Sequence, residues 1–285
     1  MKILFVYDHK YPELWRDGLW AALNLLEKDG FDVKKINLQD YYKNKEPIPW
    51  PFDFDFVLGW GAFNSEVDKT IKSYVQSTWN RERIKIGLCL GGYAIPPKGE
   101  TLDYDVLFYE TEWTLSWLYG GVSQQFPPKT ELVHAFGVNT DIYKPIPDAI
   151  KIWDWASVGA FALWKRQYLL REKGGYRLAI GEIQKDNQDE SFSIIGDLLK
   201  DDVAVSDMQD AQTLAKIYNS ANNVYIPAEI MGGGERAVLE ARACGIPVEV
   251  EFDNPKLQEL THSPIWNHYY YFDQLKKGIL SAYGK

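Results

Sequence analysis

The sequence has few of the side chains that build disulfide frameworks and metal sites. Its 285 residues include two cysteines, Cys89 and Cys244, which stand far apart in apolar stretches, and four scattered histidines. Isolated cysteines of this kind are typical of buried thiols in a reducing compartment. The histidines show no metal-ligand spacing. We therefore expect no disulfide, no bound metal and a cytoplasmic protein.

Long apolar runs and excess positive charge are also missing. No run approaches the ~20 apolar residues of a membrane span, and the first apolar run, Lys2–Tyr7, is too short for a signal peptide. We expect no integral membrane segment. The net charge of −9 argues against general affinity for nucleic acid, because that affinity depends on Lys and Arg displacing counterions. The net charge does not exclude a local basic groove.

What the sequence does contain is a repeated alternation of apolar runs with helical periodicity. The first half predicts a strand at 2–7, a helix at 13–28, a polar connection at 41–51, a strand at 54–60 and a helix at 66–79. The second half predicts a strand at 156–160, a helix at 163–172 and further alternating elements. Continuous apolar strands between helices indicate parallel sheets covered on both faces. The length is sufficient for two such domains.

The most informative stretch lies between residues 224 and 250. An apolar strand at 224–226 precedes three glycines, Gly232 to Gly234, and a helix is predicted over Glu235–Ala243. Glycines allow positive φ and close approach of a ligand to the backbone. The helix N-terminus behind them offers unpaired N–H groups and the positive end of the helix dipole, which together bind anions. Glu240 lies roughly 8 Å along the helix axis from the glycine loop. A carboxylate at this distance can accept hydrogen bonds from sugar hydroxyls.

Any βαβ unit with a glycine turn could produce this pattern, but its second half is more specific. Residues 239–248, LEARACGIPV, resemble the donor-binding motif of retaining glycosyltransferases with two Rossmann-like domains, the B architecture. In that family a first glutamate stands eight positions before Glu240, where this sequence has Gly232. Glu229 and Glu235 flank that position. The resemblance implies that one of these two contacts the transferred sugar as the catalytic carboxylate, or that the role is lost.

A second segment carries the same resemblance. Residues 137–145, GVNTDIYKP, are similar to the segment that closes the N-terminal domain in this family. The implied fold is α/β, with two Rossmann-like domains whose parallel sheets face each other across a cleft. We expect an acceptor domain over residues 1–147, a nucleotide-sugar domain over 148–265, and a terminal helix over 266–285 that packs back toward the first domain.

The basic residues of the donor site are incomplete by comparison with the family. Residues 157–166, SVGAFALWKR, resemble a segment whose arginine and lysine neutralise the donor diphosphate. Ala160 replaces the arginine, whereas Lys165 remains with Arg166 beside it. Fixed cations stabilise leaving-group charge as a glycosidic bond breaks. Arg236 could supply the missing charge or pair with Glu240 across one helical turn. Lys165 and Arg166 could also be solvated helix residues.

On the acceptor side the signals are weaker. Asp17-Gly18 falls near the position of the family's Gly-Gly loop, which would bring His9 and Asp17 toward the ligand, although a helix surface explains them better. Two Asp-x-Asp triplets, at 53–55 and 103–105, precede strands instead of following them. Ligands of such folds gather at the carboxyl ends of strands. We therefore interpret both triplets as strand starts and not as a metal site.

The resemblance implies a metal-independent, hexosyltransferase-like enzyme. It would move a sugar from a UDP- or GDP-sugar substrate, with no further cofactor and with retention of configuration. Lys165, Arg166, Gly233, Gly234, Arg236 and Glu240 would bind the donor. The acceptor, whether glycan, lipid, protein or DNA, is left open. Alternatives are a DNA-base-modifying glycosyltransferase of the same fold, a degenerate sugar-nucleotide binder, and another two-Rossmann enzyme such as an epimerase.

Overall fold

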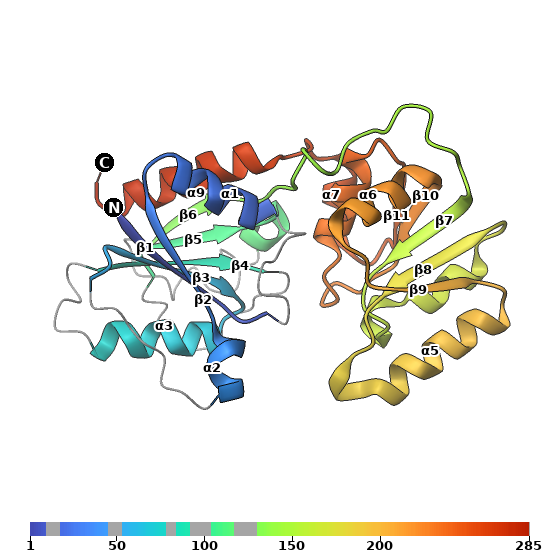
Figure 1. Cartoon of the computed structure of the whole chain (residues 1–285), viewed down its shortest axis with the longest axis horizontal. Helices are drawn as coiled ribbons and strands as arrows, with labels where there is room; N and C mark the ends of the chain where they lie inside the picture. The colour runs from blue at the N-terminus through green and yellow to red at the C-terminus, as the bar shows by residue number, and fades with distance from the viewer. Residues whose placement is uncertain (10–17, 45–52, 78–83, 92–103, 117–129, 285) are drawn as a thin grey trace. The chain divides into compact units, whose positions relative to one another are not determined.

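The chain folds into two compact units (Figure 1). The computed structural model describes residues 1–9, 18–44, 53–77, 84–91, 104–116 and 130–284. The first unit combines Met1–Phe136 with His268–Lys285, and the second is Gly137–Asn267. Within the described ranges, no helix has the length and apolar character that crossing a membrane requires.

The first unit is built on a parallel sheet with the strand order β2-β1-β3-β4-β5-β6. The inner strands are largely buried, as their near-continuous apolar sequences predict, whereas the two edge strands, β2 and β6, are partly exposed. The register pairs Phe5 with Lys35 on one side and with Leu58 on the other. The strands are β1 (Lys2–Tyr7), β2 (Asp32–Asn37), β3 (Phe56–Gly61), β4 (Lys85–Leu90), β5 (Val106–Tyr109) and β6 (Glu131–His134).

Helices cover both faces of this sheet (Figure 1). Helices α1 (Gly18–Lys28) and α9 (His268–Ser281) pack on one face, and α3 (Glu66–Ser77) packs on the other. Gly278 lets α9 approach β5 closely, since a Cβ there would lie 2.5 Å from Phe108. The connection expected from residue 41 is partly wrong, because α2 (Leu38–Asn44) continues directly from β2.

The second unit has a parallel sheet with the order β11-β10-β7-β8-β9. The strands are β7 (Trp153–Val158), β8 (Arg177–Gly181), β9 (Ala204–Asp207), β10 (Ala221–Ile226) and β11 (Val248–Val250). The helices are α5 (Gln188–Lys200), α6 (Ala211–Ser220), α7 (Glu235–Ala243) and α8 (Pro255–His262). Asp210 caps α6 by accepting a hydrogen bond from the Thr213 N–H at 2.8 Å, as short polar side chains do at helix starts.

The helix expected at 163–172 is wrong in detail. Two short 3-10 helices, η1 (Leu163–Lys165) and η2 (Gln167–Glu172), occupy this stretch. Arg166 separates them with a left-handed backbone, φ 50° and ψ 26°, which interrupts any continuous α-helix.

Each sheet reverses its strand order at one point. In the first sheet β1 lies between β2 and β3, and in the second β7 lies between β8 and β10. At such a switch point the helices leave on opposite faces, and a crevice opens outside the carboxyl ends of the two strands. The carboxyl ends of β7 and β10, and those of β1 and β3, are therefore the places to look for ligand sites.

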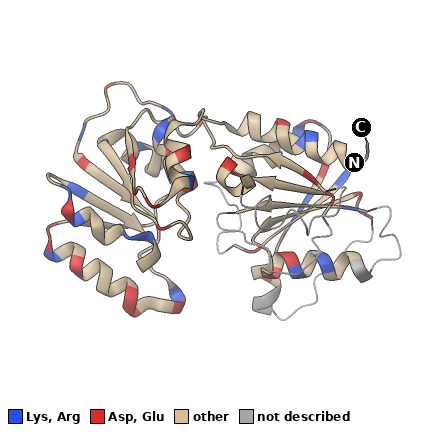
Figure 2. Cartoon of the chain, turned by 180° about the vertical axis from the view of Figure 1, so that it is seen from behind, with Lys and Arg blue, Asp and Glu red and all other residues tan. Residues whose placement is uncertain are grey.

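Charges of both signs are interspersed on the surface helices (Figure 2). On α3 Lys69 pairs with Glu66, and on α5 Lys200 pairs with Asp197. Exposed pairs of this kind contribute little to stability.

Candidate functional site

The glycine loop follows β10 at the switch point of the second sheet. Gly233 and Gly234 have φ of 68° and 113°, values that favour glycine. Gly234 is the N-cap of α7, and no side chain caps the first N–H groups of the helix. Its carbonyl accepts the first helical hydrogen bond, from the Val238 N–H at 3.1 Å. The first N–H groups of α7 therefore point toward the loop, as an anion site requires.

Gly232 lies where the surrounding backbone leaves no room for a side chain. A Cβ at this position would lie 2.4 Å from the Trp164 carbonyl oxygen and 3.0 Å from that of Glu229. The loop is closed here by two backbone hydrogen bonds, from the Gly232 N–H to the Glu229 carbonyl and from the Glu229 N–H to the Trp164 carbonyl. With this loop path, a glutamate at residue 232 would require the backbone to move.

Glu235, the first residue of α7, is buried against a lysine. Its side chain is 6% exposed and forms an ion pair with Lys256, whose side chain is fully buried. Burial alone would raise the pKa of Glu235, but the Lys256 ammonium, the Glu235 backbone N–H and the Lys165 ammonium together bring the pKa below its ordinary value. A carboxylate at the helix N-terminus is also favoured by the helix dipole. Glu235 is therefore ionised and locked in place.

Lys165 brings a second cation to the same carboxylate. A Cβ at Gly233 would lie 3.3 Å from Lys165 Nζ and 3.4 Å from Glu235 Oε2, so both groups lie beside the loop at this residue. Burial lowers the pKa of Lys165 to about 8; Glu235 opposes this shift, and Arg236 and Lys256 reinforce it. Lys165 follows β7 and Gly233 follows β10. Both strands of the switch point therefore contribute to this cluster.

Arg166 and Glu229, also predicted site residues, belong to a neighbouring cluster. Arg166 Nε donates to Glu229 Oε1 at 3.2 Å, and its Nη1 donates to Asp253 Oδ2 at 2.8 Å. The guanidinium thus holds the loop after β10 and the turn before α8 to the end of η1. In this arrangement both predicted residues have a structural use.

Glu240 is buried inside the second unit. It is 4% exposed, and its Oε2 accepts a hydrogen bond from the Tyr218 hydroxyl at 3.1 Å. Burial and the Glu240 charge raise the pKa of Tyr218 well above its ordinary value, so that the hydroxyl stays a donor. The nearby Cys244 is a buried free thiol whose pKa burial raises to about 12. Such a thiol is unreactive.

The structure also shows a site residue that the sequence analysis missed. Lys256 lies in the first turn of α8, whose N-cap Asn254 accepts from the Leu257 N–H at 3.2 Å. A cation is disfavoured at a helix N-terminus. This conflict was the available signal that Lys256 has a partner elsewhere, and that partner is Glu235. Asn254 also donates to the Ala228 carbonyl at 2.8 Å, which ties α8 to the strand end after β10.

Among the acceptor-side predictions, His9 follows β1 and Gly18 is the buried first residue of α1. Asp17 lies outside the described residues. The described aspartates of the two triplets lie at the opposite edge of the sheet, and Asp103 lies outside the described residues. Asp55 accepts from the Lys2 N–H at 2.8 Å, and Asp105 accepts from the Ile86 N–H at 2.9 Å. In the described part of the chain, no group of three or more His, Cys, Asp or Glu could hold a metal.

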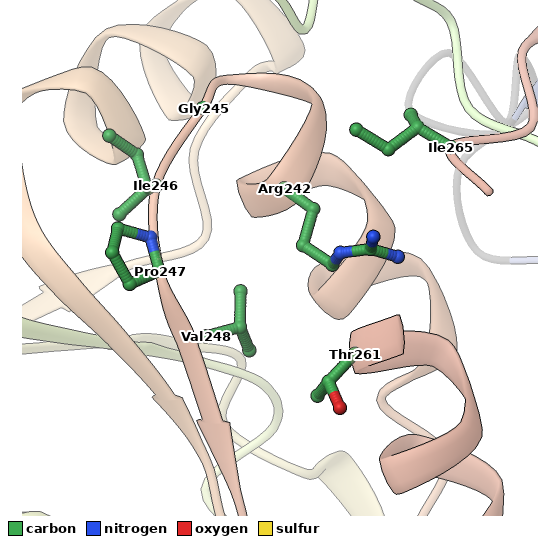
Figure 3. A pocket seen from close by; sticks show the side chains of 7 residues that line it. All are labelled: Arg242, Gly245, Ile246, Pro247, Val248, Thr261 and Ile265. Atoms are coloured by element: carbon green, nitrogen blue, oxygen red, sulfur yellow. The ribbon is translucent and has the colours of Figure 1, made fainter. Parts of the chain in front are cut away.

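A hollow of about 390 Å³ lies at the other end of α7 (Figure 3). It is lined by Arg242, Gly245, Ile246, Pro247, Val248, Thr261 and Ile265. The Arg242 guanidinium donates to the carbonyls of Leu260 and Ser263, the latter at 2.7 Å. It therefore stabilises the C-terminal end of α8, where carbonyls lack helical partners. This hollow is remote from the glycine loop along α7.

Comparisons with known proteins place this geometry in a fold class. No protein-family model and no curated protein matches the sequence. Solved structures do match. Sucrose-phosphate synthase from Thermosynechococcus elongatus is 13% identical, with 99% of this chain and 90% of that chain covered and a TM-score of 0.67.

Two further structures are similar over most or all of their length. Anabaena HepE in complex with UDP and glucose is 13% identical, covers 99% of this chain and 100% of its own, and gives a TM-score of 0.65. An alpha-glucosyltransferase in complex with UDP and a 13-mer DNA containing an HMU base is 12% identical, with 99% and 90% covered and a TM-score of 0.58. The chain therefore has the α/β fold of the B-type glycosyltransferases, with two Rossmann-like parallel sheets.

Proposed function

We propose that the chain is a glycosyltransferase whose second unit binds a nucleotide-diphosphate sugar. One observation carries this proposal. At the switch point of the second sheet, the open N-terminus of α7 meets the Lys165 ammonium beside Gly233. Backbone N–H groups, a helix dipole and a fixed cation together suit a diphosphate.

In this proposal the diphosphate lies over Gly233 and Gly234, and Lys165 and Arg236 neutralise its negative charge. Lys256 keeps Glu235 ionised, and the Glu235 carboxylate in turn holds Lys165 next to the loop. Glu235 therefore serves first as a positioning residue. Its Oε2, which faces Gly233, is also the carboxylate oxygen that we assign to a hydroxyl of the transferred sugar. Glu229, tied to Arg166, is the second candidate.

Glu240 is assigned to the ribose of the donor. Its Oε2 is fixed by the Tyr218 hydroxyl, and a carboxylate whose orientation is fixed accepts vicinal hydroxyls without ordering cost. A ribose that lacks its 2′-hydroxyl should then bind less well. The base is uracil or guanine in our proposal, and uracil has the support that HepE and the alpha-glucosyltransferase were solved with UDP.

The proposed reaction exchanges one C–O bond for another. The acceptor oxygen bonds to the anomeric carbon while the bond from that carbon to the β-phosphate oxygen breaks, with retention of configuration. The electron pair leaves on the phosphate, which also takes the acceptor proton. Lys165 and the α7 N–H groups stabilise the charge that develops there, so the step needs no metal. Because both cysteines are buried free thiols, we place the reaction in the reducing cytoplasm.

The test is a titration with UDP, GDP and 2′-deoxy-UDP, read by calorimetry and thermal shift. A nucleotide at 100 times its Kd should stabilise the protein by about 2.7 kcal/mol. Lys165→Met should weaken UDP binding. The control Lys173→Met should not, because Lys173 pairs with Glu249 beside Trp155, away from the loop. Glu240→Gln should remove the preference for UDP over its 2′-deoxy form. A wild-type protein that binds none of these nucleotides overturns the proposal.

A DNA-base acceptor is the second candidate for the same activity. Its support is the similarity to the alpha-glucosyltransferase solved with an HMU-containing DNA. Against it, the first unit has eighteen Lys and Arg and twenty Asp and Glu, so it lacks the positive excess that phosphate backbones attract. Incubation with UDP-glucose and a 5-hydroxymethyluracil oligonucleotide, followed by mass spectrometry, separates the two candidates.

A binding protein without catalysis is the third. Its support is that Gly232 has no room for a side chain and that Glu235 already forms a buried ion pair. This candidate predicts UDP binding with neither sugar transfer nor slow hydrolysis of the donor. Hydrolysis of UDP-glucose that is lost in Lys165→Met would exclude it.

A further inference from the structure

The hollow at the C-terminal end of α7 forms where the chain reverses direction (Figure 3). Gly245 follows the helix with φ 78°. Its N–H donates to the Arg242 carbonyl at 2.9 Å, and the Ile246 N–H donates to the Ala241 carbonyl at 3.0 Å. This pair of bonds is the Schellman arrangement, which ends a helix at a glycine. The turn places residues 246–248 beside Arg242, and these residues line the hollow together.

The walls of the hollow are mostly apolar. Ile246, Pro247 and Val248 line it at the start of β11, and Ile265 lines it from the segment after α8. Ile265 is 44% exposed, so the hollow is accessible from solvent. Its volume of about 390 Å³ lies within the range of small-molecule sites, roughly 300–1,000 Å³.

Among the described residues that line the hollow, Arg242 alone is charged. Figure 3 shows its side chain between Ile265 on one side and Thr261 on the other. Nη1 donates to the Leu260 carbonyl and to the Ser263 hydroxyl at 3.3 Å, and Nη2 donates to the Ser263 carbonyl at 2.7 Å. These bonds to the end of α8 fix the direction of the guanidinium.

Part of the donor capacity of Arg242 is unused. A guanidinium has five N–H donors. Within the described part of the chain, Nε donates to no acceptor, and Nη2 donates to one. Nε and Nη2 are neighbouring nitrogens, and two parallel N–H groups match the two oxygens of a carboxylate.

The charge of Arg242 is also uncompensated. The side chain is half-buried, and its acceptors in the described ranges are all neutral oxygens. Burial lowers the pKa of Arg242, and no carboxylate opposes this shift. Charges withdrawn from water are normally paired. The hollow therefore combines a fixed cation that lacks a counter-ion with apolar walls.

From this arrangement we infer that the hollow binds a small organic anion, namely a monocarboxylate with an aliphatic or aromatic body. The carboxylate accepts from Nε and Nη2 of Arg242, and the body packs on the isoleucine, proline and valine side chains of the walls. A phosphate group carries about −1.5 to −2 at neutral pH, which the single cation of the hollow does not neutralise. The inference goes beyond the proposed function and does not depend on it, because the donor site lies at the opposite end of α7.

The test is saturation-transfer NMR and calorimetric titration of the full chain with hexanoate, benzoate and phenylacetate. The matched probes are hexanamide, benzamide and phenylacetamide, which keep the shape and remove the charge. We expect at least one carboxylate to bind with a Kd of millimolar order or below. Its amide should bind about tenfold more weakly, because the charge-assisted bond to Arg242 is lost.

Two variants and one control locate the binding. Ile265→Asp adds a carboxylate to the hollow and should raise the Kd at least about tenfold by repelling the ligand. Arg242→Gln removes the cation and should do the same. The control Ile150→Asp makes the first change at a side chain that is 79% exposed and does not line the hollow, and it should leave the Kd unchanged. If Arg242→Gln does not fold, Ile265→Asp decides.

The outcomes are separable from those of the donor site. Binding that persists at saturating UDP, falls in Ile265→Asp and is normal in Ile150→Asp supports the inference. The inference is overturned if no carboxylate binds at millimolar concentration, if the amide binds equally well, or if Ile265→Asp behaves as the wild type. Displacement of the carboxylate by UDP, or tighter binding of inorganic phosphate, also overturns it. A wild type that binds no nucleotide contradicts the donor site alone.

Discussion

The buried ion pair between Glu235 and Lys256 allows the donor-site geometry to be tested without any ligand. Lys256→Met removes the ammonium and keeps most of the volume of a fully buried side chain. The carboxylate of Glu235 would then remain in a buried position with only Lys165 nearby. An uncompensated buried charge is among the largest destabilising effects of a single substitution.

The size of the effect follows from the remaining partner. Breaking a buried ion pair by removing one member costs about 3–5 kcal/mol. Because Lys165 still neutralises part of the charge, we expect a value near the lower end, about 3 kcal/mol. At about 2–4 °C per kcal/mol this corresponds to a Tm lower by roughly 10 °C. The control Lys200→Met alters a lysine whose side chain is 77% exposed, and it should change stability by less than about 0.5 kcal/mol.

The pH dependence has a definite sign. The pKa of Glu235 is lowered in the folded state, so its contribution to stability is present above the unfolded-state pKa and is lost as the pH falls through the folded value. Lys256→Met raises the pKa of Glu235. The stability difference between wild type and variant should therefore be largest near neutral pH and should shrink as the solution is acidified.

The assay is urea unfolding of the wild type, Lys256→Met, Glu235→Gln and the double variant at pH 7. In a double-mutant cycle, residues in direct contact couple by about 0.5–3 kcal/mol, and we expect the upper half of that range. If each single variant costs less than about 0.5 kcal/mol, or if the two effects simply add, then the ion pair does not exist as described. The assignment of Glu235 as a positioning residue would fall with it.

Three other predictions concern the same unit. UDP affinity should decrease as the pH rises through about 8, where Lys165 loses its proton, and calorimetry should find this inflection absent in Lys165→Arg. Gly234→Ala, at φ 113° and with its Cβ 2.9 Å from Ile226, should cost about 1–3 kcal/mol of unfolding free energy. The open helical control Gly196→Ala should be neutral or stabilising. Arg242→Ala, which leaves the α8 carbonyls unpaired, should cost about 1–3 kcal/mol in urea unfolding.

Local sequence signals correctly predicted those helices and strands whose conformation depends mainly on their own residues. The helix over Glu235–Ala243 was predicted with both of its ends as observed, because glycines precede it and strong helix formers fill it. The parallel sheets followed from uninterrupted apolar runs. The break at Arg166 could not be predicted, since its partners Glu229 and Asp253 lie 63 and 87 residues further along the chain.

The candidate site divides in the same way. The family resemblance predicted Lys165, Gly233 and Glu235 as donor-site residues, and the structure brings these three together. Lys256 lies 21 residues beyond Glu235 and Tyr218 lies 22 residues before Glu240, and neither belongs to any motif. Their roles arise from packing of α8 and α6 against α7, which a pattern in one sequence does not encode.

The return of α9 to the first unit has a consequence for synthesis on the ribosome. Tyr271, Leu275 and Ile279 of α9 are buried in the core that also contains β1 and α1. That core therefore cannot be completed until these late residues have been translated, whereas Gly137–Asn267 forms a continuous unit that is available earlier. Until α9 has been translated, the apolar face of the N-terminal strands that α9 later covers stays exposed. The nascent chain should therefore depend on chaperones at this stage.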